Sequence, residues 1–129
     1  MIPPPSRSLV ALVTGANRGL GLEIVRQLAL TGMKAVLAAR DGGKGQEAAT
    51  SLVAMRLDVA SVTLDVDDVA SVSEGIAETV RRFGRIDVLV NNAGVLLDGP
   101  DAQTASVLDL PPERLLAAFR TNALVARIF

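Results

Sequence analysis

The chain has 129 residues, of which half are apolar and only three, all Phe, are aromatic, and its formal net charge is −1. This balanced charge provides no basic surface for nucleic acid or an anionic membrane, so we expect neither partner. The absence of Cys and His excludes disulfides, thiolate metal sites and imidazole acid–base chemistry. The length suits one domain, and a core of Val, Leu, Ile and Ala favours buried parallel strands covered by helices.

Residues 1–8 contain three consecutive prolines, Pro3 to Pro5, and lack the apolar segment of a signal peptide. We therefore expect a flexible tail that precedes a folded domain of residues 9–129. No later apolar run is long enough to span a bilayer, which favours a cytoplasmic protein.

The first half of the chain alternates between patterns typical of strands and helices. Residues 9–13 form an apolar run that predicts a buried strand. Apolar residues at helical spacing predict a helix over residues 19–30, with Gly32 just past its end. Residues 35–39 predict a second strand, and residues 44–54 predict a second helix.

The alternation continues in the second half. Residues 61–64 predict a third strand, and residues 69–83 predict a helix that Gly84 stops. Residues 87–90 predict a fourth strand. After an irregular stretch, Pro111 and Pro112 open a last helix whose inner face carries Leu115, Leu116, Phe119 and Ala123.

Strands that alternate with helices require crossover connections, so the strands should be parallel and the crossovers right-handed. The expected fold class is α/β, a doubly wound, Rossmann-like parallel sheet. The chain stops at Phe129 without a capping signal. We therefore expect the domain to be incomplete at its C-terminus, truncated after four strands and the helix that follows.

The strongest motif is Thr-Gly-Ala-Asn-Arg-Gly-Leu-Gly, residues 14–21, between the first strand and the first helix. Gly15 permits a tight turn, Gly19 allows backbone to approach a pyrophosphate, and Gly21 lets the helix lie close to the sheet. The helix N-terminus supplies N–H donors, so the context indicates phosphate binding. The spacing differs from the standard Gly-x-Gly-x-x-Gly fingerprint, and the alternative is an ordinary strand-to-helix loop.

This turn has the Thr-Gly-x-x-x-Gly-x-Gly form of the short-chain dehydrogenase/reductase family, which the chain resembles. Three further segments agree in order and approximate spacing: Asp65-Val66 after the third strand, Asn91-Asn92-Ala93-Gly94 after the fourth, and Thr121-Asn122 in the last helix. The resemblance covers residues 9–129 and corresponds to the first part of the family's domain. It implies an oxidoreductase that transfers a hydride between a nicotinamide cofactor and a carbonyl or alcohol substrate.

Ligands of such sheets bind outside the carboxyl ends of the strands. There the Asp65 carboxylate would accept from the adenine amino group, Val66 would offer its N–H, and Asn92 would hold its turn by local hydrogen bonds. Taken alone, Asp65 is also consistent with a simple strand end, and residues 91–94 with a simple turn. The expected cofactor-binding residues are Thr14, Gly15, Asn17, Arg18, Gly19, Leu20, Gly21, Arg40, Asp65, Val66, Asn92, Ala93 and Gly94.

The charge after the second strand predicts the cofactor. NAD binders place an acid there for the ribose 2'-OH, whereas Arg40 occupies that place here and suits a 2'-phosphate. Arg18 in the glycine turn could reach the same phosphate, and basic residues at both positions resemble the NADPH-preferring carbonyl reductase branch. Asp41 would oppose this preference if it pointed inward, and either arginine alone is also consistent with a solvated surface residue. We expect NADP(H).

Asn122 is the only candidate catalytic residue. In the family this Asn helps to order a water and the catalytic Lys, while a Ser, a Tyr and that Lys carry out the proton chemistry. The chain has no Tyr, and neither Ser106 nor Lys44 lies at a matching place. We therefore expect the nucleotide-binding part of an NADPH-dependent oxidoreductase whose full-length parent acts on a small carbonyl or alcohol.

Two alternatives remain open at this point. The second hypothesis is a truncated, non-catalytic module that binds NADP(H) or a partner, and the third is a non-binding remnant of a truncated gene, against which the intact glycine turn and Arg18 argue. In the family the helix that matches residues 112–129 helps to form the subunit interface, so the resemblance also implies a homo-oligomer.

Overall fold

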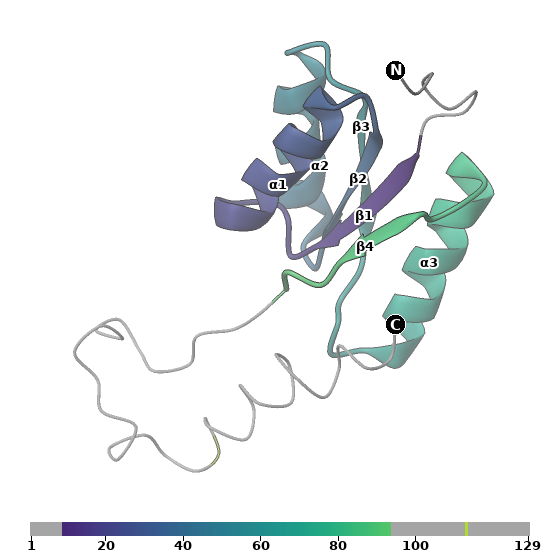
Figure 1. The fold of residues 1–129 in the computed structure, drawn as a ribbon. Helices are drawn as coiled ribbons and strands as arrows, with labels where there is room; N and C mark the ends of the chain where they lie inside the picture. The colour runs from purple at the N-terminus through teal and green to yellow at the C-terminus, as the bar shows by residue number, and fades with distance from the viewer. Residues whose placement is uncertain (1–8, 94–112, 114–129) are drawn as a thin grey trace.

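The computed structural model describes residues 9–93 and Glu113. The expected tail of residues 1–8, Gly94, and the last helix with Asn122 lie outside the described residues. In the described part, a parallel sheet of four strands in the order β3-β2-β1-β4 is flanked by three helices (Figure 1). The elements are β1 (Val10–Thr14), α1 (Gly19–Leu30), β2 (Lys34–Ala39), α2 (Gly42–Val53), β3 (Val59–Thr63), α3 (Val69–Phe83) and β4 (Val88–Val90).

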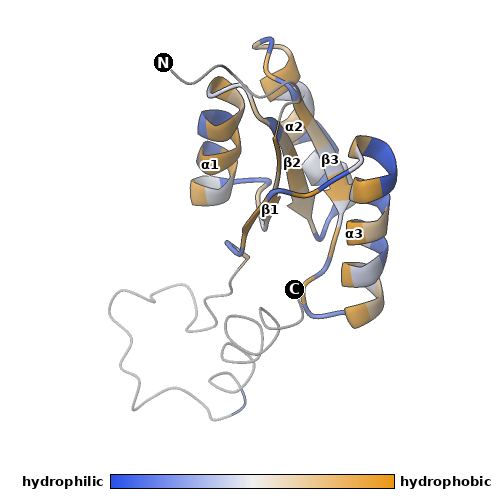
Figure 2. Cartoon of the chain, turned by 45° about the vertical axis from the view of Figure 1, so that its right-hand side comes forward, coloured by the Kyte–Doolittle hydropathy of each residue, from blue (hydrophilic) through white to orange (hydrophobic). Residues whose placement is uncertain are grey.

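The helices cover both faces of the sheet, as Figures 1 and 2 show: α1 and α2 lie on one face and α3 on the other. Successive residues of a strand point to opposite faces, so β1 contributes to two cores. Val13 is buried in the core under α1 and α2, whereas Leu12 is buried in the core that also contains Val72 of α3. The predicted doubly wound α/β fold is confirmed.

The strand order reverses at β1. Leu12 pairs with Val36 of β2 on one side and with Leu89 of β4 on the other. The chain therefore leaves β1 toward β2 and β3 and returns to place β4 on the opposite side. In open α/β sheets, ligands bind at such a reversal, outside the carboxyl ends of the two diverging strands.

Two elements begin two residues earlier than predicted, each for a physical reason, and the other boundaries agree with the prediction to within one residue. β3 begins at Val59 rather than residue 61, because it pairs with β2 from Val59 opposite Ala35 to Thr63 opposite Ala39. α2 begins at Gly42 rather than residue 44, because the Asp41 side chain accepts the Lys44 N–H at 3.1 Å and caps the helix.

The limits of α3 agree with the prediction. Asp68 caps its first turn, and Gly84 ends it in the left-handed conformation with φ of 85°. None of the helices in residues 9–93 combines the length and the hydropathy needed to cross a membrane.

Candidate functional site

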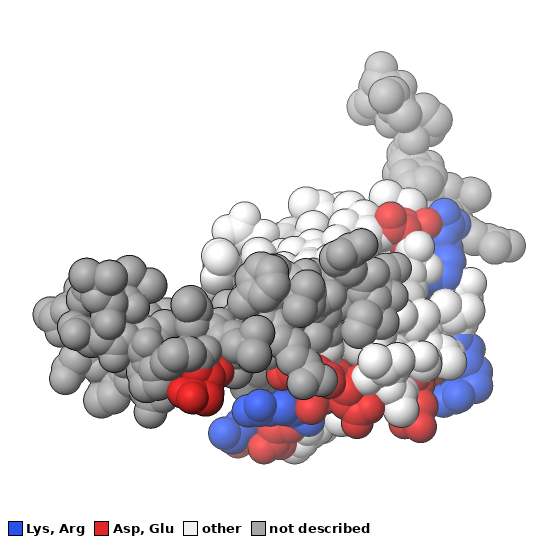
Figure 3. Space-filling model, turned by 90° about the horizontal axis from the view of Figure 1, so that it is seen from below, with Lys and Arg blue, Asp and Glu red and all other residues white. Residues whose placement is uncertain are grey.

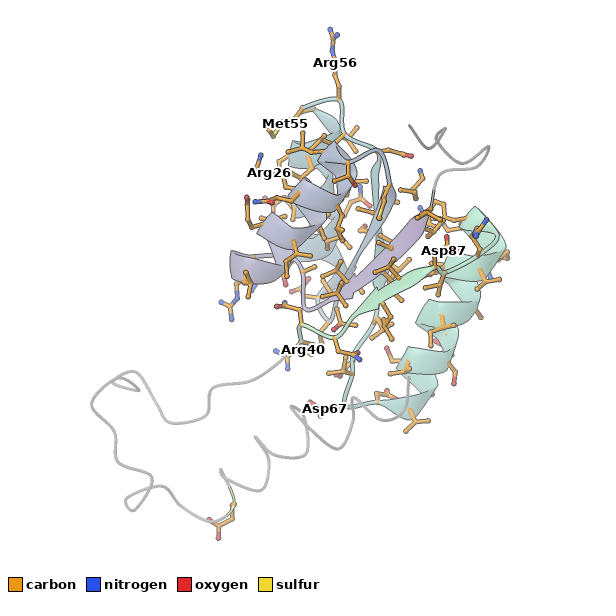
Figure 4. The ribbon with its side chains drawn as sticks, in the orientation of Figure 1. Arg26, Arg40, Met55, Arg56, Asp67 and Asp87 are labelled. Carbon is orange, nitrogen blue, oxygen red and sulfur yellow. The ribbon has the colours of Figure 1, made fainter. Side chains whose placement is uncertain are left out.

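A cleft with a volume of about 900 Å³ opens at the carboxyl ends of the strands. It contains every predicted cofactor-binding residue except Thr14, which is buried, and Gly94, which lies outside the described residues. Figure 4 shows Arg40 and Asp67 at this end of the domain and Arg56 at the opposite end. The lining residues are Gly15, Asn17, Arg18, Gly19, Leu20, Gly21, Leu22, Arg40, Asp41, Lys44, Glu47, Ala48, Leu64, Asp65, Val66, Asp67, Asn92 and Ala93.

The N-terminus of α1 enters this cleft without a side-chain cap. Its N-cap residue, Arg18, is extended and makes no capping hydrogen bond, whereas Asp41 and Asp68 cap α2 and α3. The first N–H groups of a helix have no partner within the helix and carry its positive dipole end. Gly19 follows with φ of 59°, and a Cβ there would meet no other heavy atom within 4 Å. The backbone of this turn is therefore accessible to a ligand.

Gly15 and Gly21 leave no room for a side chain, because neighbouring backbone packs closely against both. A Cβ at Gly15 would lie 2.7 Å from the Ala93 Cα, and its φ of 60° favours glycine. A Cβ at Gly21 would lie 2.7 Å from the Gly15 carbonyl oxygen and would overlap the Asn92 amide. The glycine turn, the start of α1 and the end of β4 thus form one packed unit.

Thr14 and Asn92 hold that unit together. The buried Thr14 hydroxyl accepts the backbone N–H groups of Asn92 and Ala93, at 3.1 and 3.0 Å. The Asn92 amide donates to the carbonyl oxygens of Thr14 and Gly15, at 3.2 and 3.1 Å. The Asn92 amide nitrogen thus binds the turn after β1, and the expectation that Asn92 also holds its own turn, which runs on to Gly94 outside the described residues, stays a prediction. Thr14 itself is buried and does not line the cleft.

The cleft has basic and acidic groups side by side. Arg18 and Arg40 are exposed and line it, as does Lys44 in the first turn of α2, which the sequence reasoning missed. Asp41 could have identified Lys44 as a lining residue. As the N-cap it starts α2 at Gly42, two residues before the predicted start, which places Lys44 in the first turn of the helix. Glu47 was missed for the same reason. Figure 3 shows Lys and Arg side chains beside Asp and Glu side chains on this end of the molecule.

The turn after β3 supplies a second wall. One Asp65 carboxylate oxygen accepts the Asp67 N–H at 3.0 Å, and the Asp65 N–H donates to the Ser71 hydroxyl at 2.8 Å. Val66 follows Asp65 and also packs its side chain against the core under α3. Asp65 and Val66 are therefore held at the wall of the cleft by contacts with the start of α3.

The arrangement matches that of a known family. Residues 9–125 match the family model described as short chain dehydrogenase. The chain belongs to the short-chain dehydrogenase family. The predicted resemblance is confirmed.

Three of the relatives illustrate the similarity. The chain is 47% identical over 91 residues to (+)-neomenthol dehydrogenase from Arabidopsis thaliana, which covers 66% of this chain and 30% of that protein. It is 46% identical over 87 residues to carbonyl reductase (NADPH) 1 from Macaca fascicularis, which covers 67% of this chain and 31% of that protein. The crystal structure of an actinorhodin polyketide ketoreductase variant with NADPH superimposes with a TM-score of 0.82 at 34% identity, covering 93% of this chain and 44% of that one. The chain spans less than half the length of these relatives.

Proposed function

We propose that this chain forms the NADP(H)-binding part of an NADP-dependent short-chain oxidoreductase. One observation carries the proposal: at the strand-order reversal, a helix N-terminus without a side-chain cap lies in the same cleft as Arg18 and Arg40. The two relatives whose names include NADPH support the same cofactor.

The glycine turn fits the pyrophosphate of the dinucleotide. The N–H groups at the start of α1 and the dipole of that helix favour an anion. Gly19 keeps the approach to this backbone open, and Gly21 allows α1 to begin close to Gly15. We assign the pyrophosphate to this turn.

We assign the 2'-phosphate to Arg18 and Arg40. A charge-assisted hydrogen bond contributes roughly 1.5–3 kcal/mol, so each arginine would favour NADPH over NADH by about ten-fold or more. Asp41 lines the same cleft, where its carboxylate accepts the Lys44 N–H and caps α2, so its negative charge offsets part of this preference. Lys44 adds a third positive charge to this side of the cleft.

We assign the adenine to Asp65 and Val66 and the adjoining ribose to Ala93, with Gly94 beyond it. When bound, NADPH supplies the hydride that reduces a carbonyl carbon to an alcohol. For the whole protein we propose the interconversion of a small carbonyl compound and its alcohol. Asn122, outside the described residues, is our proposed catalytic residue within this chain, and residues 112–129 are our proposed subunit interface.

Calorimetric titration of the 129-residue chain with NADPH and NADH tests the cofactor site. The method is suitable because the chain has neither Trp nor Tyr to report binding by fluorescence. We expect NADPH to bind at least ten-fold more tightly than NADH. A chain with a folded circular dichroism spectrum that binds neither cofactor would overturn the proposal.

Arg40→Ala and Arg56→Ala form a charge-matched pair. Each removes one positive charge, but Arg56 is exposed at the end of the domain opposite to Arg40 (Figure 4). We expect Arg40→Ala to weaken NADPH about ten-fold with little effect on NADH, and Arg56→Ala to change neither. An equal loss for both cofactors in Arg40→Ala would contradict the 2'-phosphate assignment.

A further inference from the structure

The turn between β3 and α3 is anchored by the helix that follows it. The Leu64 N–H donates to the Ala39 carbonyl oxygen at 2.9 Å and makes the last contact of this segment with β2. The N–H of the next residue, Asp65, donates to the Ser71 hydroxyl of α3 at 2.8 Å and not to the sheet. The connection to α3 therefore begins at the residue that lines the cleft.

Gly75 allows this contact by bringing α3 close to the end of β3. Residues four apart lie on the same face of a helix, so Ser71 and Gly75 face the sheet together. Gly75 is buried, and a Cβ there would lie 2.8 Å from the Leu64 Cδ1. The absence of a side chain at Gly75 thus sets the distance at which Ser71 reaches Asp65.

Ser71 is not needed as the cap of its own helix. Asp68 fills that role, since its carboxylate accepts the N–H groups of Ala70 and Ser71 at 3.0 and 3.3 Å. The Asp68 N–H in turn donates to the Asp65 carbonyl oxygen at 3.1 Å. The start of α3 therefore binds Asp65 on both sides, at its N–H through Ser71 and at its carbonyl through Asp68.

We propose that Ser71 is a positioning residue that fixes Asp65 and Val66 for recognition of the adenine ring. The inference rests on the proposed NADP(H) function. The Asp67 N–H holds one oxygen of the Asp65 carboxylate, and Ser71 holds the Asp65 backbone, so the carboxylate keeps one orientation toward the cleft. Loss of the Ser71 hydroxyl frees the Asp65 N–H and lets this wall of the cleft shift.

A pair of cofactors isolates this effect. NADPH carries the adenine amino group, whereas its hypoxanthine analogue has an oxygen there, which cannot donate to the Asp65 carboxylate. We expect the unmodified chain to prefer NADPH by roughly ten-fold. Ser71→Ala should reduce this preference to about two-fold or less, and Ser71→Thr, which keeps a hydroxyl, should restore most of it.

Ser73→Ala is the matched control. Ser73 is exposed on the same helix and does not line the cleft, so its loss should leave the preference unchanged. The exchange rate of the Asp65 amide hydrogen provides a readout without any cofactor. We expect Ser71→Ala to accelerate it several-fold and Ser73→Ala to have no effect.

The outcomes separate this inference from the proposed function. A folded chain that does not bind NADPH overturns the proposed function and this inference with it, whatever the amide exchange shows. If NADPH binds, full discrimination between the cofactors in Ser71→Ala overturns the positioning role of Ser71. An equal loss of affinity for both cofactors in a folded Ser71→Ala indicates a merely structural role and also overturns it. An unmodified chain that binds both cofactors equally overturns adenine recognition through Asp65.

Discussion

Asn92 donates two hydrogen bonds to Thr14 across the reversal point of the sheet, one from its backbone and one from its side chain. The Thr14 hydroxyl accepts the Asn92 N–H at 3.1 Å, and the Asn92 amide donates to the Thr14 carbonyl oxygen at 3.2 Å. These bonds join the ends of β1 and β4, the two strands between which the cleft opens. The position of the glycine turn therefore depends on a residue 78 positions further along the chain.

Thr14→Val tests this connection, because valine has nearly the same shape but cannot accept the Asn92 and Ala93 N–H groups. We expect the free energy of unfolding to fall by about 1–3 kcal/mol, the cost of removing a buried acceptor from part-buried donors. Urea denaturation followed by circular dichroism measures the change. Thr63→Val, an exposed residue of β3, is the control and should change stability by less than about 0.5 kcal/mol. Equal midpoints for the two variants would contradict the assignment.

Gly21→Ala tests the packing of α1 against the turn. The added Cβ would lie 2.7 Å from the Gly15 carbonyl oxygen, so we expect a loss of about 1–3 kcal/mol in unfolding free energy and weaker NADPH binding. Gly43→Ala is the control of opposite sign. Gly43 lies in α2, where a Cβ would meet only the Asp41 carboxylate at 3.4 Å, and alanine favours the helix by up to about 1 kcal/mol. Urea denaturation and calorimetry check both changes, and a Gly21→Ala variant as stable as the unmodified chain would contradict the close packing.

The sequence predicted the elements well where periodicity and caps agreed. Residues 19–30 and 69–83 carry apolar residues at helical spacing, and their observed limits match. β3 was misplaced because Ala60 and Ser61 are half-exposed at the edge of the described sheet, so the start of the strand lacks an apolar run. The start of α2 was predicted two residues too late, because Asp41 caps the helix ahead of two glycines.

The site was predictable where a motif defines it and not where tertiary packing does. The glycine turn, Arg40 and Asp65 were identified from short segments, and the structure places them in one cleft. Ser71 gave no such signal, because its contact with Asp65 depends on how closely α3 approaches β3, which Gly75 determines. Spacing along the chain does not encode that distance.

The edge of the described sheet at β3 gives another prediction. Ser61 lies at the middle of β3, and its carbonyl oxygen accepts from Arg82 at 3.0 Å while its hydroxyl donates to Gln46 at 3.0 Å. Long polar side chains from α3 and α2 thus cover an edge that would otherwise be open to pairing with another strand. We expect Arg82→Ala to increase concentration-dependent self-association.

Light scattering after size-exclusion chromatography, at several protein concentrations, measures this effect. Arg81→Ala is the control. Arg81 is exposed and precedes Arg82 on the same helix, and its substitution removes the same charge. Association of the two variants to the same extent would show that the cover over Ser61 does not protect the edge.

The start of β4 gives a prediction about pH. The Asp87 carboxylate accepts the Val10 N–H at 2.8 Å and binds Arg85 at 2.6 Å. These contacts, the Val10 hydrogen bond foremost and Arg85 after it, hold the pKa of Asp87 below its ordinary value. Because the folded-state pKa is lowered, the stability that Asp87 contributes is present above the unfolded-state pKa of about 3.9 and is lost as the pH falls through the lower, folded-state pKa.

Asp87→Asn keeps an oxygen that can accept the Val10 N–H but removes the charge. We expect this variant to be less stable than the unmodified chain at about pH 7, and the difference to shrink steadily below about pH 4, where the carboxylate of the unmodified chain becomes protonated. Urea midpoints measured across this range check the prediction, with Glu74→Gln, an exposed carboxylate of α3, as the control. A stability difference that stays constant from neutral to acidic pH would mean that the charge of Asp87 contributes nothing, and that the hydrogen bond to Val10 acts through its geometry alone.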